Sequence, residues 1–432
     1  MASVVAAEQR RLEHRLWLLS VPVPPVTDLQ QVGFDALIVP VGVASVAEEQ
    51  ASFKLSPQVP LESLEGFPVW ALVWVEGEKT SEAAAEAFWN QVGPAVRGLQ
   101  MPVKGLVLAA RKWIVSLSSL ARAVGKRASL SVEVASPARE LVSASSRENF
   151  RGLGLVALAL GNLEAEGFPP LAPYDAERLL DALDKVGEPL RAGIVLTSRT
   201  EPVLPAQERA WSLLLNQNLE YQPVEGHDVF LAKGPLSVGS WTLPPGGQIR
   251  LQIMDGARLQ RDLGLALRPV RHNLLGWDSV GAPLPEPGLG LSWQALVAFY
   301  AGAAPQPRPV LRLRWTSSTT ATIIVENPMP FASAFGVTGN VVDLTFAGSE
   351  VKDLTLLAAV GADFGRLSEK FVRTSRGPAD TVRLYLRMFP PRLAVEAAQV
   401  QFVARPSKLA ARFLARLGDG REVSGVVPIL GP

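Results

Sequence analysis

Cysteine is absent from this 432-residue chain, and histidine occurs three times, at His14, His227 and His272. Without cysteine the chain has no disulfide, no thiolate metal ligand and no cysteine nucleophile. Three histidines so far apart in the sequence do not suggest a histidine-rich metal site. We therefore predict neither a metal nor another cofactor.

The chain also lacks an excess of charge of either sign, because 42 lysines and arginines stand against 41 aspartates and glutamates. Proteins that bind nucleic acid usually carry a basic surface, so we expect no nucleic-acid partner. No run of about 18 apolar residues occurs, which predicts no transmembrane helix. Met1 to Arg11 lacks the apolar core of a signal peptide, so export would require a leader that has been removed.

What the chain does have is length and apolar content. Its 432 residues exceed one ordinary domain, and 48% of them are hydrophobic, which is enough for a sizeable core. Only 19% are charged, which argues against a disordered chain. We expect two folded domains.

Short apolar runs alternate with helix-like stretches from Leu16 to about Asn218. Repeated strand–helix units whose strands are apolar on both faces favour a parallel sheet covered by helices. Seven such runs occur, and their sequences are RLWLLSVPVPP, GFDALIVPVGVAS, GFPVWALVWVEGE, VKGLVLAAR, ASLSVEVAS, GLGLVALALGN and AGIVLTSRT.

An open doubly wound sheet and a closed barrel are both compatible with this alternation. A dinucleotide-binding sheet should carry G-x-G-x-x-G after its first strand, and neither that motif nor a Walker loop is found there. The sequence therefore favours a TIM-like (β/α)8 barrel over residues 12–303, with a hairpin insertion near 220–255. We take Gly264–Val270 as its closing strand and Ser292–Gly302 as its last helix.

A proline-rich linker follows at 304–309, and the pattern changes after it. From Val310 to Pro432 alternating β-rich stretches with few helix signals predict an antiparallel β-sandwich.

The stretches GFDALIVPVGVAS, LALRPVRHNLLGWDSV, SWQALVAFYAGAAPQPRPVLRLRW and ATIIVENPMPFASA resemble a bacterial family without a settled activity. Its members have glycoside-hydrolase-like barrels followed by a β domain, and many are exported. The resemblance implies a periplasmic or cell-surface location. In that family the fourth strand tends to end in acidic residues, whereas here Leu106–Arg111 ends in two alanines and an arginine.

Barrel enzymes place their active sites at the carboxyl ends of the strands, and glycosidases need two carboxylates there. Glu76 and Glu133 are the candidate catalytic pair, with Glu164 as an alternative acid. Trp74 and Trp113 are candidate stacking platforms for a sugar. The structural alternatives are a solvated turn for Glu76, a buried ion pair with Arg111 or Arg199 for Glu133, and core packing for the tryptophans.

Basic residues gather near the same predicted rim. If Arg111, Arg199, Arg268 and Arg271 converge there, they would attract an anionic ligand such as a uronic acid. His272 is a further candidate for ligand binding, with a hydrogen-bonded structural role as the alternative.

Because the strand-four acids are missing, the first hypothesis is a degenerate, non-catalytic barrel that binds a glycan or a partner protein at the cell envelope. The alternatives are an active glycoside hydrolase using Glu76 and Glu133, and a structural subunit of an assembly.

Overall fold

The structure is a computed structural model that describes residues 12–19, 23–77, 82–99, 101–110, 117–137, 154–158, 189–205, 207–224, 227–267, 273–281, 283, 289–367, 370–374 and 379–430. The chain divides into two compact units, each of them discontinuous in sequence. Unit 1 comprises Met1–Leu196 and Asp262–Ala282, and unit 2 comprises Thr197–Arg261 and Pro283–Pro432.

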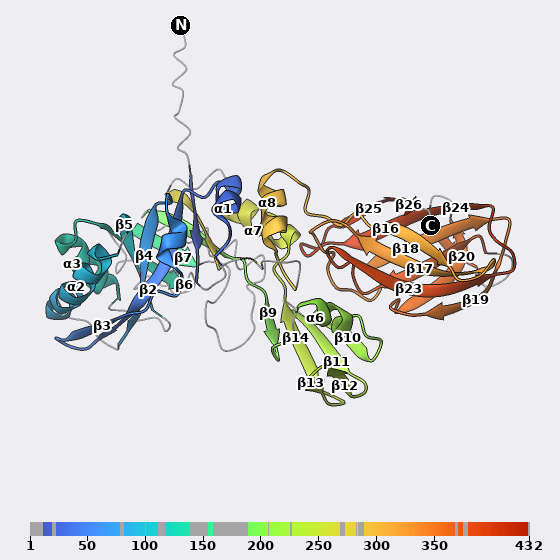
Figure 1. The fold of residues 1–432 in the computed structure, drawn as a ribbon, viewed down its shortest axis with the longest axis horizontal. Helices are drawn as coiled ribbons and strands as arrows, with labels where there is room; N and C mark the ends of the chain where they lie inside the picture. The colour runs from blue at the N-terminus through green and yellow to red at the C-terminus, as the bar shows by residue number, and fades with distance from the viewer. Residues whose placement is uncertain are drawn as a thin grey trace, which may run out of the picture. The chain divides into compact units, whose positions relative to one another are not determined.

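Unit 1 is a mixed α/β structure built on a barrel-like parallel sheet (Figure 1). Its parallel strands, in spatial order, are β1 (Glu13–Trp17), β15 (Leu274–Val280), β8 (Leu190–Val195), β7 (Gly154–Leu158), β6 (Ser131–Pro137), β5 (Val103–Ala110), β4 (Val69–Glu76) and β2 (Ala36–Val46). A short pairing of three residues also joins β1 to β2. The edge strand β3 (Ala51–Leu55) runs antiparallel to β2.

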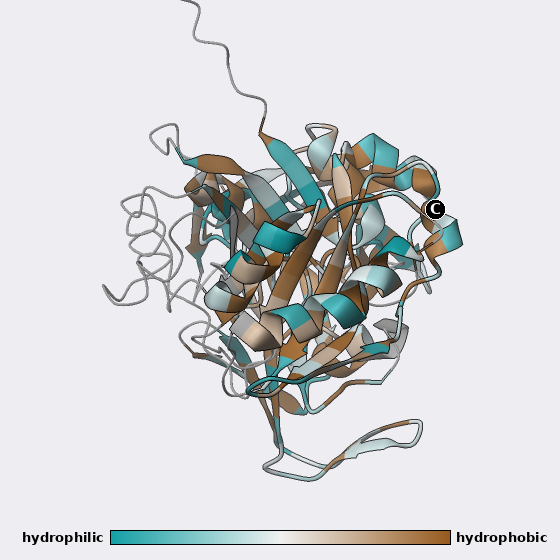
Figure 2. Ribbon diagram, turned by 90° about the vertical axis from the view of Figure 1, so that its left-hand side faces the viewer, coloured by the Kyte–Doolittle hydropathy of each residue, from teal (hydrophilic) through white to brown (hydrophobic). Residues whose placement is uncertain are grey.

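Few helices accompany these strands in the described residues. They are α1 (Val26–Val32), the 3-10 turn η1 (Leu61–Leu64), α2 (Glu82–Arg97), α3 (Leu117–Arg127) and α7 (Gly256–Ala266), whose second half belongs to unit 1. Figure 2 looks onto this unit, with mainly brown strands behind helices that alternate teal and brown. Strands with both faces covered are expected to be apolar throughout, and seven of the eight residues of β4 are buried.

The prediction of a closing strand at Gly264–Val270 is wrong, because helix α7 occupies the first part of that range. Leu259, Leu263 and Ala266 are buried at helical spacing, so the apolar residues form one side of a helix rather than a strand. The last strand of the sheet is β15, which pairs in parallel with β8 and β1.

The residues predicted as a hairpin insertion form small antiparallel sheets in unit 2. The elements are β9 (Arg199–Glu201), α6 (Gln207–Leu214), β10 (Leu219–Val224), β11 (His227–Ala232), β12 (Leu236–Val238), β13 (Trp241–Leu243) and β14 (Gln248–Gln252). Their core includes Phe335 and Met388 from the later part of the chain. Arg387 donates to the carbonyl oxygens of Leu214 and Asn216 at 2.8 and 2.6 Å, and so ties this segment to the rest of unit 2.

The remainder of unit 2 begins with α8 (Trp293–Tyr300), capped by the Ser292 hydroxyl, which accepts from the amide of Ala295 at 3.1 Å. The chain then forms two mainly antiparallel sheets. One contains β19 (Val351–Leu356), β23 (Leu393–Phe402), β17 (Thr320–Asn327), β16 (Val310–Trp315) and β26 (Ile429–Leu430), in that order. The other contains β21 (Phe371–Arg373), β20 (Gly361–Leu367), β22 (Thr381–Leu386), β18 (Asn340–Ala347), β24 (Lys408–Arg416) and β25 (Glu422–Val427).

Buried side chains from both sheets form a single apolar cluster, which is the core of a β-sandwich. Within the described residues, no helix has the length and apolar character needed to cross a membrane.

Candidate functional site

The interior of unit 1 holds charged side chains from several strands. Arg15 on β1 is fully buried, and its guanidinium donates to both oxygens of Asp278 on β15, at 2.8 and 2.9 Å. One of the two nitrogens involved, Nη2, also donates to Glu133 on β6 at 2.7 Å. Glu133 is 5% exposed and Asp278 is 0% exposed, so both carboxylates are shielded from solvent.

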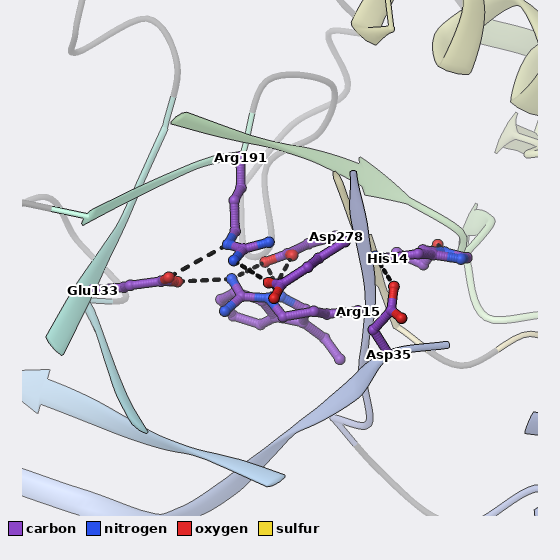
Figure 3. A network of polar contacts seen from close by, with 9 residues as sticks. His14, Arg15, Asp35, Glu133, Arg191 and Asp278 are labelled. Carbon is purple, nitrogen blue, oxygen red and sulfur yellow. Dashed lines mark hydrogen bonds and ion pairs between the residues drawn. The ribbon is translucent and has the colours of Figure 1, made fainter. Parts of the chain in front are cut away.

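A second arginine extends this group. Arg191 on β8 donates through Nε to the other oxygen of Glu133 at 3.3 Å, and through Nη2 to Glu13. Figure 3 shows the carboxylate of Glu133 facing both guanidinium groups, with a contact to each. We call Glu13, Arg15, Glu133, Arg191 and Asp278 the interior charge cluster.

The electrostatics of the cluster favour ion pairs. Burial opposes the charge of Arg15, but the carboxylates of Asp278 and Glu133 outweigh it and raise the pKa of Arg15 above its ordinary value. The indole Nε1 of Trp17 donates to Asp278 at 2.9 Å, and the Arg15 guanidinium lies 4.7 Å from the ring centre of Trp70. Each of the buried charged side chains therefore contacts a group of opposite charge, and these side chains are Arg15, Glu133, Arg191 and Asp278.

The cluster lies away from the place where barrels usually carry out chemistry. Glu133 is the third of seven residues of β6 and Arg191 the second of six in β8, whereas Arg15 is the middle residue of β1 and Asp278 the fifth of seven in β15, so the cluster lies near the middle of the strands. Barrel active sites are built at the carboxyl ends of the strands. The position favours a structural role in the interior of the sheet.

The spacing of the two buried acids is nevertheless close to that of a glycosidase pair. Glu133 and Asp278 accept from the same nitrogen of Arg15, so the two bonded oxygens lie within about 6 Å of each other. A retaining glycosidase has comparable spacing, but its carboxylates must contact the sugar. These two carboxylates are buried and contact arginine.

His14 points to the opposite face of β1 from Arg15. Its Nε2 lies 2.9 Å from the hydroxyl of Ser279, its ring stacks on Trp277 at 4.5 Å, and its backbone amide donates to Asp35. Burial lowers the pKa of His14 to about 3, so the ring is neutral at physiological pH. It acts here as a packed, hydrogen-bonded residue.

Glu76 is the last residue of β4 and is exposed at the carboxyl end of the sheet. It borders a hollow of about 340 Å³ that is also lined by Ser45, Gln50 and Ser52 of the β2–β3 hairpin. Trp74 is 9% exposed and packs in the apolar interior of the sheet. Glu76 and Glu133 thus lie in different surroundings, one open and one enclosed.

The other predicted site residues divide between unit 2 and the part of the chain outside the described residues. Arg199 is partly exposed in β9 of unit 2, where it pairs with Gln252 of β14. The remaining candidates fall outside the described residues, and they are Arg111, Trp113, Glu164, Arg268, Arg271 and His272.

Arg15 and Arg191 are not among the site residues predicted from the sequence, and the buried ion pair weighed there as an alternative for Glu133 named Arg111 or Arg199. A usable signal was present, since EHRLW, SVEVAS, LRAGIV and GWDSV each carry charge inside an apolar strand. Charges in such strands require partners of opposite sign. Among the described residues, no three histidine, aspartate or glutamate side chains are grouped so as to hold a metal ion.

Comparison with known proteins gives no family for this chain. No protein-family model matches it, and neither does any curated protein. One solved structure, the crystal structure of a beta-glycosidase from Bacteroides vulgatus, matches with 11% identity and a TM-score of 0.24. The match covers 97% of this chain and 64% of that one. At this score the match carries no argument about fold or activity.

Proposed function

We propose that unit 1 is a glycosidase-like (β/α)8 barrel that serves as a non-catalytic scaffold and binds a glycan or a partner protein at the cell envelope. The observation that carries this proposal is the burial of Glu133 and Asp278 against Arg15. A catalytic acid must reach the substrate, and these two carboxylates are already used in ion pairs. The envelope location is supported by the family resemblance.

The alanines at the end of β5 also support a non-catalytic role. Ala109 and Ala110 close a strand whose counterpart in the resembled family ends in acids. Among the described residues near the carboxyl ends of the parallel strands, Glu76 ends β4, and Glu48 and Glu49 follow β2 in the exposed turn to β3. The exposed hollow beside Glu76 is the candidate place for a ligand, because it offers hydroxyl and amide groups next to one charge.

The test compares binding with turnover on the intact chain. Chromogenic aryl glycosides of hexoses, pentoses and uronic acids report hydrolysis, and a glycan array reports binding. We expect binding of at least one glycan class without hydrolysis, and weaker binding by Glu76→Ala. Hydrolysis that disappears in Glu133→Gln, with the fold intact, would contradict the proposal.

An active hydrolase that uses Glu76 is the second candidate. It is favoured by the exposure of Glu76 at the carboxyl end of β4, where barrel enzymes place catalytic groups. Turnover abolished by Glu76→Gln and retained by Glu133→Gln would support this candidate and exclude the scaffold proposal.

A further inference from the structure

The two sheets of the β-sandwich in unit 2 differ in their number of strands. The sheet that ends in β19 has five strands, and the sheet that ends in β21 has six. β19 and β20 line the same hollow, so β19 faces β20 across the sandwich. The outermost strand, β21, therefore faces a position that no described strand of the shorter sheet occupies.

Side chains that should be covered are exposed at this position. Phe364 of β20 pairs directly with Val382, which is fully buried in the core, so both point to the inner face of the sheet. Arg366 is two residues beyond Phe364 and pairs with Val372 of β21, which places Val372 on the same inner face. Phe364 is 38% exposed and Val372 is 58% exposed. The inner face here carries the apolar side chains of Phe364 and Val372 beside the exposed arginine Arg366, and no described strand covers it.

The edge of the shorter sheet can accept one more strand over part of its length. β19 pairs with β23 and with no other strand of the described residues. A bulge between Val351 and Asp353, together with Lys352, disrupts the first half of the edge, as in many protected edges. From Asp353 to Leu356 the pairing with β23 is regular over about 13 Å of strand, and the amide of Leu354 donates to the side chain of Asp353 at 2.9 Å, a bond that an added strand would replace.

A hollow of about 580 Å³ lies along this edge. Its apolar lining includes Leu354, Leu356 and Phe364, and its charged lining consists of Glu350, Lys352 and Asp353. The charged side chains carry a net charge of about −1, which favours a basic group on the bound strand. The volume is in the range of pockets that bind specific ligands.

A second copy of the chain does not fit as the occupant. In such a copy the strand β19 is backed by its own β20, because those two strands face each other across the sandwich. Pairing two β19 edges would bring the β20 of one copy to the place that β21 of the other already fills. No described residue of the shorter sheet occupies the position opposite β21, which accepts one strand with nothing stacked behind it.

We propose that the β19 edge binds a single extended segment of another protein by β-strand addition, in which apolar residues alternate with basic ones. Its backbone pairs with Asp353–Leu356, its apolar side chains cover Phe364 and Val372, and its basic side chains face outward near Asp353 and Glu350. This proposal concerns unit 2 and stands apart from the function proposed for unit 1.

The experiment uses a fluorescein-labelled peptide of three Lys-Val repeats and the full chain, followed by fluorescence anisotropy. We expect saturable binding below about 1 mM. Val372→Glu should weaken it at least tenfold, because a carboxylate would be buried beneath the added strand. The added negative charge alone would attract the peptide, so weaker binding cannot be a charge effect.

The matched control is Val426→Glu on β25, which places the same charge on another exposed valine, 76% exposed, at the far edge of the same sheet. It should leave the affinity within twofold of wild type. Absence of saturable binding, or equal weakening by both variants, would overturn the proposal. Dimerisation of the free protein that Val372→Glu abolishes would also overturn it, since the occupant would then be a second copy.

Discussion

Replacing Glu133 by Gln separates a structural role from a catalytic one. The glutamate carboxylate accepts from Arg15 at 2.7 Å and from Arg191 at 3.3 Å, in surroundings that exclude water. Glutamine keeps the size of the side chain but has one acceptor oxygen, so its amide nitrogen would face an N–H group of one arginine. The substitution also removes one of the two carboxylates that each arginine contacts.

The expected loss of stability depends on the hydrogen bonds that each arginine retains in the variant. Arg15 keeps both bonds to Asp278, and Arg191 keeps its bond to Glu13, so neither cation is left wholly unpaired. Breaking a buried pair by removing one partner costs about 3–5 kcal/mol, and partial retention places Glu133→Gln near the lower limit. We expect the free energy of unfolding to fall by about 3 kcal/mol.

Urea denaturation followed by tryptophan fluorescence measures this change, because Trp17 and Trp70 both contact the cluster. Glu76→Gln is the matched control, since Glu76 is exposed and its replacement should change stability by less than about 0.5 kcal/mol. A Glu133→Gln variant as stable as wild type, or more stable, would refute the reasoning. Removing a catalytic carboxylate commonly has that effect, so the enzyme hypothesis would then return.

Three further perturbations test other parts of the fold. His14 has a pKa of about 3 when folded and 6.5 when unfolded, so the unfolded state takes up the proton first. The stability of the wild type should therefore fall by about 2 kcal/mol between pH 7 and pH 5, and His14→Gln should remove that part of the slope in urea titrations. Arg387→Met removes a donor from the carbonyl oxygens of Leu214, Asn216 and Leu219, of which Asn216 keeps the amide of Leu219, and should cost about 3 kcal/mol and speed protease cleavage near α6. Gly276→Ala would place a methyl group 1.9 Å from the carbonyl oxygen of Glu13, so we expect a sharp loss of folded protein in circular dichroism and expression assays.

Several strands could be predicted from the sequence because their signal is local. The runs around Ile38, Leu72 and Leu106 are continuously apolar, and each forms a buried strand of the parallel sheet. The change of pattern at Val310 likewise follows from alternation within single strands, and the structure has antiparallel sheets from there on.

The last strand could not be found in this way, because its signal depends on distant partners. GWDS resembles a turn, and Asp278 is a poor strand residue by propensity. In the fold its carboxylate accepts from Arg15 and Trp17, more than 260 residues earlier in the chain. The same holds for Glu133, whose ion-pair partners Arg15 and Arg191 lie 118 residues earlier and 58 residues later in the chain. Because these partners are far apart in the sequence, a local pattern does not show which charged residues pair inside the sheet.

The interleaving of the two units has a consequence for how this chain is dissected and made. A truncation at the proline-rich segment 304–309 would leave Thr197–Arg261 attached to the first unit but without Phe335 and Arg387, against which that segment packs. Removal of 197–261 as well would be needed to isolate the parallel sheet. During synthesis, β15 leaves the ribosome only after residues 197–261 have been made. Arg15 and its counterion Asp278 are separated by 263 residues, so their ion pair forms only late in synthesis. The ribosome must therefore release most of the chain before either unit can complete its core.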